Sequence, residues 1–84
     1  MNKELFILKN YGHIELNLKQ FMDEKKVTRN ALARAVNVRF EVIDKWYNGH
    51  IERMDMDILA RICFVLECTP GDIIKYVISS ETKE

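Results

Sequence analysis

The sequence predicts an all-α fold of five short helices, preceded by a short N-terminal β-hairpin or arm. Apolar residues recur at helical spacing in five segments of residues 16–78, and most of these segments carry residues typical of helix ends. Of the 84 residues, only three are Gly and one is Pro, while 48% are apolar, which favours one compact, helix-rich domain. Residues 79–84 are expected to form a frayed tail.

Residues 1–15 have the pattern of a β-hairpin or arm. Residues 5–8 are an apolar run, residues 9–12 have turn chemistry, and polar and apolar residues alternate over 13–18. An isolated two-stranded hairpin is marginal in water. We therefore expect this hairpin to lie on the helices or to pair with a strand of a second chain.

Two short helices are predicted next, over residues 17–26 and 29–36. Thr28 is a suitable N-cap for the second of them. Asn37 follows it, and Asn tolerates the left-handed backbone conformation that a tight turn between helices requires. The first helix has three apolar residues on one face: Leu18, Phe21 and Met22.

Three further helices complete the predicted domain. One covers about residues 39–48 and stops at Gly49, and the next is capped by Asp55. Thr69 and Pro70 then mark the start of a fifth helix. The apolar residues expected to face the core are Ile43 and Trp46 in the third helix, Ile58, Leu59, Ile62, Cys63 and Leu66 in the fourth, and Ile73, Ile74 and Val77 in the fifth. Phe21, Phe64 and the Met side chains are also expected to be core residues.

Two separate motifs resemble one known family. Residues 28–38 (TRNALARAVNV) and 39–49 (RFEVIDKWYNG) resemble the helix-turn-helix of the Cro and phage-repressor family, often called the XRE family. Residues 54–63 and 66–74 look like its closing helices, including the Pro-Gly-Asp turn. The first motif matches at six positions: Leu32, Ala33, Val38, Ile43, Trp46 and Gly49.

The resemblance covers residues 16–78 and implies a compact, repressor-like DNA-binding domain. Members of the family usually bind double-stranded DNA as twofold dimers and place the second helix of the motif in a major groove. By this resemblance the chain is expected to be a small transcriptional regulator that binds an inverted-repeat operator as a homodimer. The N-terminal hairpin is a possible dimer contact.

Helical geometry selects the residues expected to face DNA. With Ile43 and Trp46 in the core, the outward side chains of the third helix are Phe40, Glu41, Asp44 and Lys45, with Arg39 at its start. Arg39 and Lys45 suit guanine, Glu41 or Asp44 suits the cytosine amino group, and Phe40 or Val42 suits a thymine methyl. Phosphate contacts are expected from Arg29, Asn30, Asn48, His50 and Arg53. For each of these residues, the alternative is an ordinary solvated surface position.

Three departures from the family pattern and the charge balance leave a second function open. Asn37 replaces the usual turn glycine, Arg39 replaces a small hydroxyl cap, and Glu41 and Asp44 would face the phosphates. Unpaired acids there oppose binding. Thirteen basic and thirteen acidic residues cancel, although residues 28–53 have five basic and three acidic residues, a net of +2. The alternative is a protein-interaction module, antitoxin-like or adaptor, that keeps the fold without sequence-specific DNA binding.

Other classes of function have no support in the sequence. Cys63 and Cys68 are expected on different faces with no His nearby, so neither a metal site nor a cofactor is predicted. His13 and His50 have no nucleophile or carboxylate at a spacing that suggests catalysis, and no enzyme or small-molecule ligand is expected. No apolar segment approaches the length of a membrane span or a signal core, so a cytoplasmic location is expected.

Overall fold

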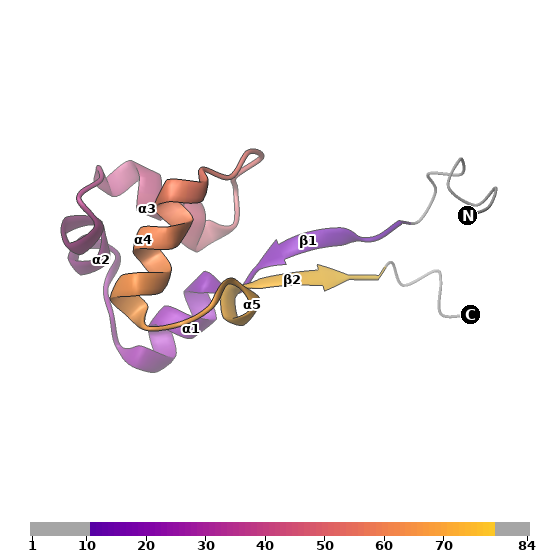
Figure 1. The fold of residues 1–84 in the computed structure, drawn as a ribbon, viewed down its shortest axis with the longest axis horizontal. Helices are drawn as coiled ribbons and strands as arrows, with labels where there is room; N and C mark the ends of the chain where they lie inside the picture. Colours follow the sequence, from indigo (N-terminus) through magenta and orange to yellow (C-terminus); the bar gives the residue numbers. More distant parts are fainter. Residues whose placement is uncertain (1–10, 79–84) are drawn as a thin grey trace.

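The computed structural model describes residues 11–78 as five helices and a two-stranded antiparallel sheet (Figure 1). The fold is therefore helical with a small β addition, and the term all-α is slightly imprecise for it. The elements follow one another as β1 (His13–Leu16), α1 (Leu18–Lys25), α2 (Arg29–Val36), α3 (Phe40–Asn48), α4 (Met56–Leu66), α5 (Pro70–Ile73) and β2 (Ile74–Val77).

Local capping explains where the central helices begin and end. The Thr28 hydroxyl accepts a hydrogen bond of 3.1 Å from the backbone N–H of Ala31 at the start of α2. Asp55 caps α4 in the same way. Asn37 and Gly49 have positive φ angles of 61° and 73° and end α2 and α3 in the left-handed conformation. These four sequence predictions are confirmed.

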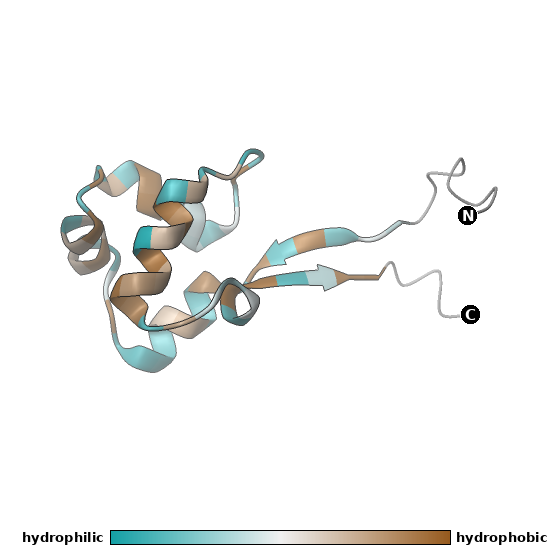
Figure 2. Ribbon diagram, in the orientation of Figure 1, coloured by the Kyte–Doolittle hydropathy of each residue, from teal (hydrophilic) through white to brown (hydrophobic). Residues whose placement is uncertain are grey.

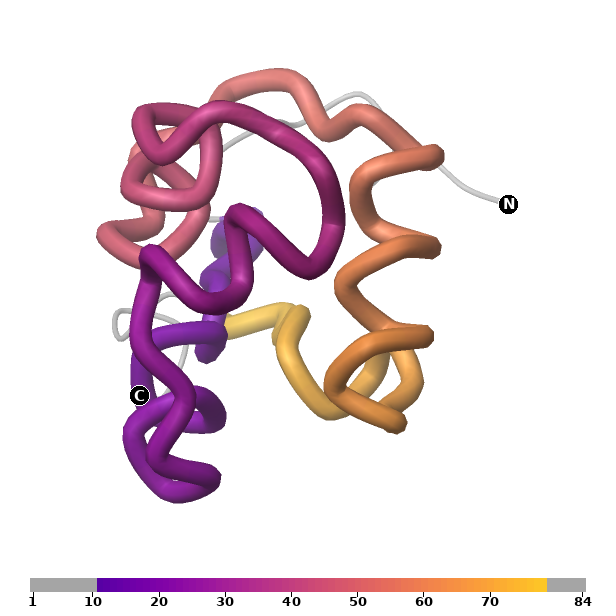
Figure 3. Tube along the Cα trace, turned by 90° about the vertical axis from the view of Figure 1, so that its left-hand side faces the viewer, coloured from indigo at the N-terminus to yellow at the C-terminus, as the bar shows by residue number. Residues whose placement is uncertain are grey.

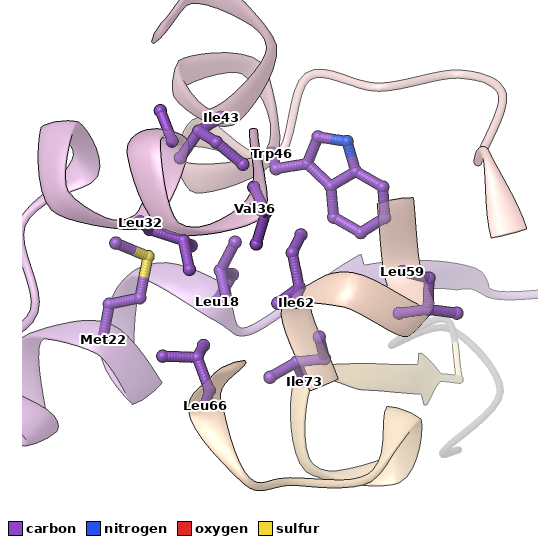
Figure 4. Close-up of a cluster of buried hydrophobic side chains, with 11 residues drawn as sticks. Leu18, Met22, Leu32, Val36, Ile43, Trp46, Leu59, Ile62, Leu66 and Ile73 are labelled. Atoms are coloured by element: carbon purple, nitrogen blue, oxygen red, sulfur yellow. The ribbon is translucent and has the colours of Figure 1, made fainter. Parts of the chain in front are cut away.

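The helices enclose one hydrophobic core (Figures 3 and 4). Helix α2 packs on α3 and α4, and α1 packs on α3 and α5. Trp46 is 3% exposed, and Ile43 and Ile62 are fully buried. The other buried apolar residues are Leu18, Met22, Leu32, Ala33, Val36, Leu59, Leu66 and Ile73.

The C-terminal segment differs from its prediction. Helix α5 ends at Ile73, and residues 74–77 form β2, which pairs with β1 so that Leu16 lies opposite Ile74. The predicted helix positions of Ile74 and Val77 are therefore wrong. The backbone N–H of Asn17 donates a 2.7 Å hydrogen bond to the Ile73 carbonyl, which ties the start of β2 to the end of β1.

The N-terminal hairpin was predicted with its second strand in the right place. Residues 13–16 do form a strand, but its partner in the described part of the chain is β2, from the other end of the domain. The proposed first strand, residues 5–8, lies outside the described residues. Strand β2 thus satisfies the backbone hydrogen bonds along one edge of β1.

Two predictions about helix α4 are also wrong. Phe64 is 83% exposed rather than buried, because α4 turns Leu59, Ile62 and Leu66 toward the core and Phe64 away from it. Among the predicted core methionines, Met22 is fully buried, but Met56 is exposed.

The two cysteines are neighbours, contrary to the expectation of different faces. Glu67 takes a left-handed conformation (φ 56°), which turns the chain back so that the N–H of Cys68 donates to the Cys63 carbonyl at 3.0 Å. Burial, together with the nearby Cys63 thiol, raises the pKa of Cys68 to about 11. Within residues 11–78, no group of three or more potential metal ligands occurs, and no helix has the length and apolarity to cross a membrane.

Candidate nucleic-acid interface

Helix α3 presents one side to the core and the other to solvent. Ile43 and Trp46 are buried, whereas Glu41 and Lys45, one turn apart on the opposite side, are exposed. Phe40, at the start of the helix, is 38% exposed. The outward orientation predicted for these three side chains is confirmed, and it leaves the surface of α3 free for a ligand.

Asp44 is half-buried and paired. Its Oδ1 accepts a hydrogen bond of 2.6 Å from the Arg29 Nη1 of helix α2, which forms an ion pair that we call the Arg29–Asp44 bridge. The side chains of Arg29 and Asp44 are 41% and 36% exposed, so solvent screening limits the bridge to about 1 kcal/mol or less. The guanidinium carbon also lies 4.7 Å from the ring centre of Tyr47 and 5.6 Å from that of Phe40.

Asn48 completes the surroundings of Asp44. Its side-chain amide donates to the Asp44 backbone carbonyl at 2.9 Å and to the carboxylate at 3.2 Å. The carboxylate therefore has two donors within the protein, and its charge is partly compensated before any DNA approaches. This reduces the penalty that an acid on this helix would impose near phosphates.

A second polar cluster lies beside Arg29, and no sequence pattern predicted it. The Tyr47 hydroxyl donates to Asp23 at 2.8 Å, and the Lys19 ammonium donates to the same carboxylate at 3.1 Å. The Tyr47 hydrogen bond and Lys19 lower the pKa of Asp23. The same Asp23 carboxylate raises the pKa values of Tyr47 and of Lys19. Tyr47 and Asp23 are 24 residues apart, so no local pattern could predict their contact.

A hollow of about 590 Å³ lies where the end of α1, the start of α2 and α3 meet. Two of the predicted phosphate contacts, Arg29 and Asn30, line it together with Phe40. Lys26 also lines it and was not among the predicted site residues. The remaining lining residues are Asp23, Val27, Thr28 and Tyr47.

The other predicted site residues do not line this hollow. Arg39 is the exposed N-cap of α3 in an extended conformation, and its side chain makes no capping hydrogen bond. His50 and Arg53 are exposed in the loop between α3 and α4, beyond the C-terminal end of α3. Within the described range, no ion pair engages Arg39, Lys45 or Arg53. The structure thus brings Arg29, Asn30, Phe40, Asp44 and Asn48 together and leaves the other five more separate.

Comparison with known proteins identifies the family to which this chain belongs. The model of the Cro/C1-type helix-turn-helix DNA-binding domain matches residues 17–78. The chain belongs to this family. It is 28% identical over 69 residues to the uncharacterized helix-turn-helix transcriptional regulator YozG of Bacillus subtilis (strain 168), and the match covers 82% of each protein.

Two solved structures have the same fold as this Cro/C1-type domain. One is a protein from Bacteroides fragilis that is named as a candidate DNA-binding protein, with a TM-score of 0.66 and 21% identity over 75% of this chain and all of that one. The other is the transcriptional regulator VanUg, with a TM-score of 0.65 and 23% identity over 87% of this chain and 96% of that one.

Proposed function

We propose that the protein is a small transcriptional regulator that binds double-stranded DNA sequence-specifically, with α3 in the major groove. One observation carries the proposal. Helix α3 buries Ile43 and Trp46 against the domain and turns a face with Glu41 and Lys45 to solvent, directly after the tight turn at Asn37. The membership of the Cro/C1-type family supports the same conclusion.

Each exposed residue has a role in this proposal. Arg39 and Lys45 donate to guanine, Glu41 accepts from the cytosine amino group, and Phe40 contacts a thymine methyl. Asp44 has a different role from the one expected, because it already accepts from Arg29 and Asn48. It positions Arg29 rather than reading a base.

In the proposal, phosphate contacts come from two places, the start of α2 and the region at the C-terminal end of α3. Lys26, Arg29 and Asn30 line the hollow at the start of α2, and the free N–H groups of the helix terminus favour an anion. Asn48, at the C-terminal end of α3, and His50 and Arg53, beyond that end, would supply further phosphate contacts. Such contacts position the protein without selecting a sequence. We further propose that two copies bind an inverted repeat, with one α3 in each half-site.

The test is selection of bound duplexes from a random library at low and moderate salt. We expect the wild-type chain to enrich a palindrome, and the double variant Arg39→Ala and Lys45→Ala to lose that enrichment. The matched control is Lys25→Ala with Lys75→Ala, which removes the same charge from exposed positions outside α3 and should retain the palindrome. Equal loss in both double variants would show that only overall charge matters and would contradict the role of α3.

A protein-interaction module is the second candidate. The exposed apolar side chains of Met56 and Phe64 on α4 favour it, because large exposed apolar surfaces are often contact sites. Binding to short duplexes that falls steeply with salt supports the DNA function. Absence of any enriched duplex at low salt, with salt-insensitive capture of a protein partner, would support the module instead.

A further inference from the structure

Helix α4 ends in a turn that leads to α5 and brings two cysteines together (Figure 1). Glu67 is in the left-handed conformation, and its backbone N–H donates to the Phe64 carbonyl at 3.3 Å. The N–H of Cys68 donates to the Cys63 carbonyl at 3.0 Å. This pair of hydrogen bonds is the Schellman arrangement, in which the side chains at the positions of Cys63 and Cys68 commonly contact each other. We call these two side chains the Cys63–Cys68 dithiol.

The backbone geometry of the dithiol suits a disulfide bond. With ordinary bond lengths, the 3.0 Å hydrogen bond between Cys68 and Cys63 keeps their Cα atoms within about 7 Å of each other. A disulfide requires Cα atoms that are no more than about 7 Å apart. Both cysteines are free, and burial followed by the nearby Cys63 thiol raises the pKa of Cys68, which shows that the two thiols are close. We therefore expect a bond between the two sulfurs to leave the path of the backbone unchanged.

The dithiol can be reached from solvent. The side chains of Cys63 and Cys68 are partly exposed, and both of them line two surface hollows, one of about 480 Å³ and one of about 630 Å³. Helix α4 is hydrophobic over most of its length (Figure 2), and Met56, Phe64 and Pro70 also line the first hollow. A small molecule can therefore meet the dithiol without any opening of the core.

We propose that the Cys63–Cys68 dithiol is a reversible oxidation site, which a small-molecule disulfide converts to an intramolecular disulfide. Packing alone would be satisfied by any small apolar residue at the two positions. Two thiols that are close together and reached from solvent also permit thiol–disulfide exchange. The residues that line the two hollows include none of the proposed DNA contacts, so the inference does not depend on the proposed function.

The exchange takes place in two steps. With a pKa of about 11, Cys68 is protonated at neutral pH, so Cys63 is the attacking residue. The Cys63 thiol loses its proton to water, and its sulfur attacks one sulfur of the external disulfide and releases a thiolate. The Cys68 thiol then loses its proton to solvent as its sulfur attacks the Cys63 sulfur and releases the second thiolate. Solvent protonates both thiolates, so two electrons pass from the dithiol to the external disulfide, which becomes two thiols.

The fold should favour the disulfide. In an unfolded chain, the bond must close a loop around the four residues between the two cysteines, which costs conformational entropy. In the folded chain, the turn at Glu67 has already closed this loop. For a loop this short, the saved entropy corresponds to a roughly 30-fold larger ratio of disulfide to dithiol in the folded chain than in the unfolded chain, at the same redox conditions.

The test is equilibration of the full chain, without DNA, in mixtures of bis(2-hydroxyethyl) disulfide and 2-mercaptoethanol. This neutral probe suits the site because Glu67 and Asp72 line the second hollow and would repel an anionic disulfide. Samples in native buffer and in concentrated urea are stopped with acid, and chromatography with mass spectrometry measures the dithiol, the mixed disulfide and the intramolecular disulfide. We expect the ratio of disulfide to dithiol to be roughly 30-fold higher in native buffer, with the helix content unchanged by circular dichroism.

The matched control is the double variant Val65→Cys and Cys68→Ser, which moves one thiol to the outer side of α4. Residues two apart on a helix do not face each other, so folding should lower the ratio of disulfide to dithiol in this variant. Four results would overturn the inference: equal ratios in native buffer and urea for the wild type, mixed disulfide as the native end product, loss of helix on oxidation, or the same gain in the control. A wild type that shows the gain but enriches no duplex would leave this inference standing and remove the proposed function.

Discussion

Replacing Asp44 by Asn should make the protein slightly less stable and make it bind DNA more tightly. The variant keeps an oxygen that can accept from Arg29 and Asn48 but removes the negative charge of the Arg29–Asp44 bridge. Both side chains of the bridge are more than a third exposed, so the free energy of unfolding should fall by about 1 kcal/mol or less.

The gain in DNA affinity follows from Coulomb's law. A carboxylate about 10 Å from a phosphate in water costs about 0.4 kcal/mol. If α3 lies in the groove, two or three phosphates are near this distance, so the neutral variant should bind roughly five-fold more tightly at low salt. The gain should shrink as salt rises, because ions screen charges over about 10 Å at 0.1 M.

Two assays check this prediction together. Chemical denaturation measures the free energy of unfolding, and fluorescence anisotropy of a labelled duplex over a salt series measures affinity. Glu84→Gln, the same loss of one negative charge far along the sequence from α3, is the control and should leave affinity nearly unchanged. Weaker binding by Asp44→Asn at low salt would refute the reasoning, since it would mean that the charge of Asp44 assists DNA binding.

Two further predictions concern the folded domain. Tyr47→Phe removes the main cause of the lowered pKa of Asp23, so that pKa should rise, as an NMR titration of the carboxyl would measure. A carboxyl with a lowered folded-state pKa stabilises the fold above its unfolded pKa and loses this contribution as pH falls through the folded value, so the variant should lose it at a higher pH. Ile62→Ala, at a fully buried position, should lower the free energy of unfolding by about 2–5 kcal/mol, whereas Val65→Ala on the outer side of α4 should cost about 1 kcal/mol or less; equal effects would contradict the assigned core.

The central helices were predictable because their signals are local. Thr28, Asn37, Gly49 and Asp55 act within one turn of their own helix ends, so a single sequence contains the information. The segment after Ile73 was not predictable in this way. Its Ile and Val residues fit a helical stripe as well as a strand, and the choice depends on β1, about 60 residues earlier in the chain.

The same difference between local and long-range interactions decides which features of the candidate site were predictable. The exposure of Glu41 and Lys45 followed from the helical period once Ile43 and Trp46 were assigned to the core. The Arg29–Asp44 bridge did not follow, because it joins residues 15 apart and depends on how α2 crosses α3. Helical period predicts which way a side chain points, but not which side chain of another helix it meets.

The bridge also changes how the neutral charge of the chain should be interpreted. Formal net charge counts Asp44 and Asp23 against DNA binding, yet each of them lies within 3.1 Å of a cationic group of the same domain, Arg29 and Lys19. The field near α3 depends on the charges that remain after such pairing, and among the described residues Arg39, Lys45 and the acid Glu41 are in no ion pair. Two basic residues and one acidic residue therefore remain, so a chain with thirteen acidic and thirteen basic residues can still present a locally basic helix surface to DNA. Asp44→Asn tests this argument directly, because it changes the formal charge and the pairing at the same position.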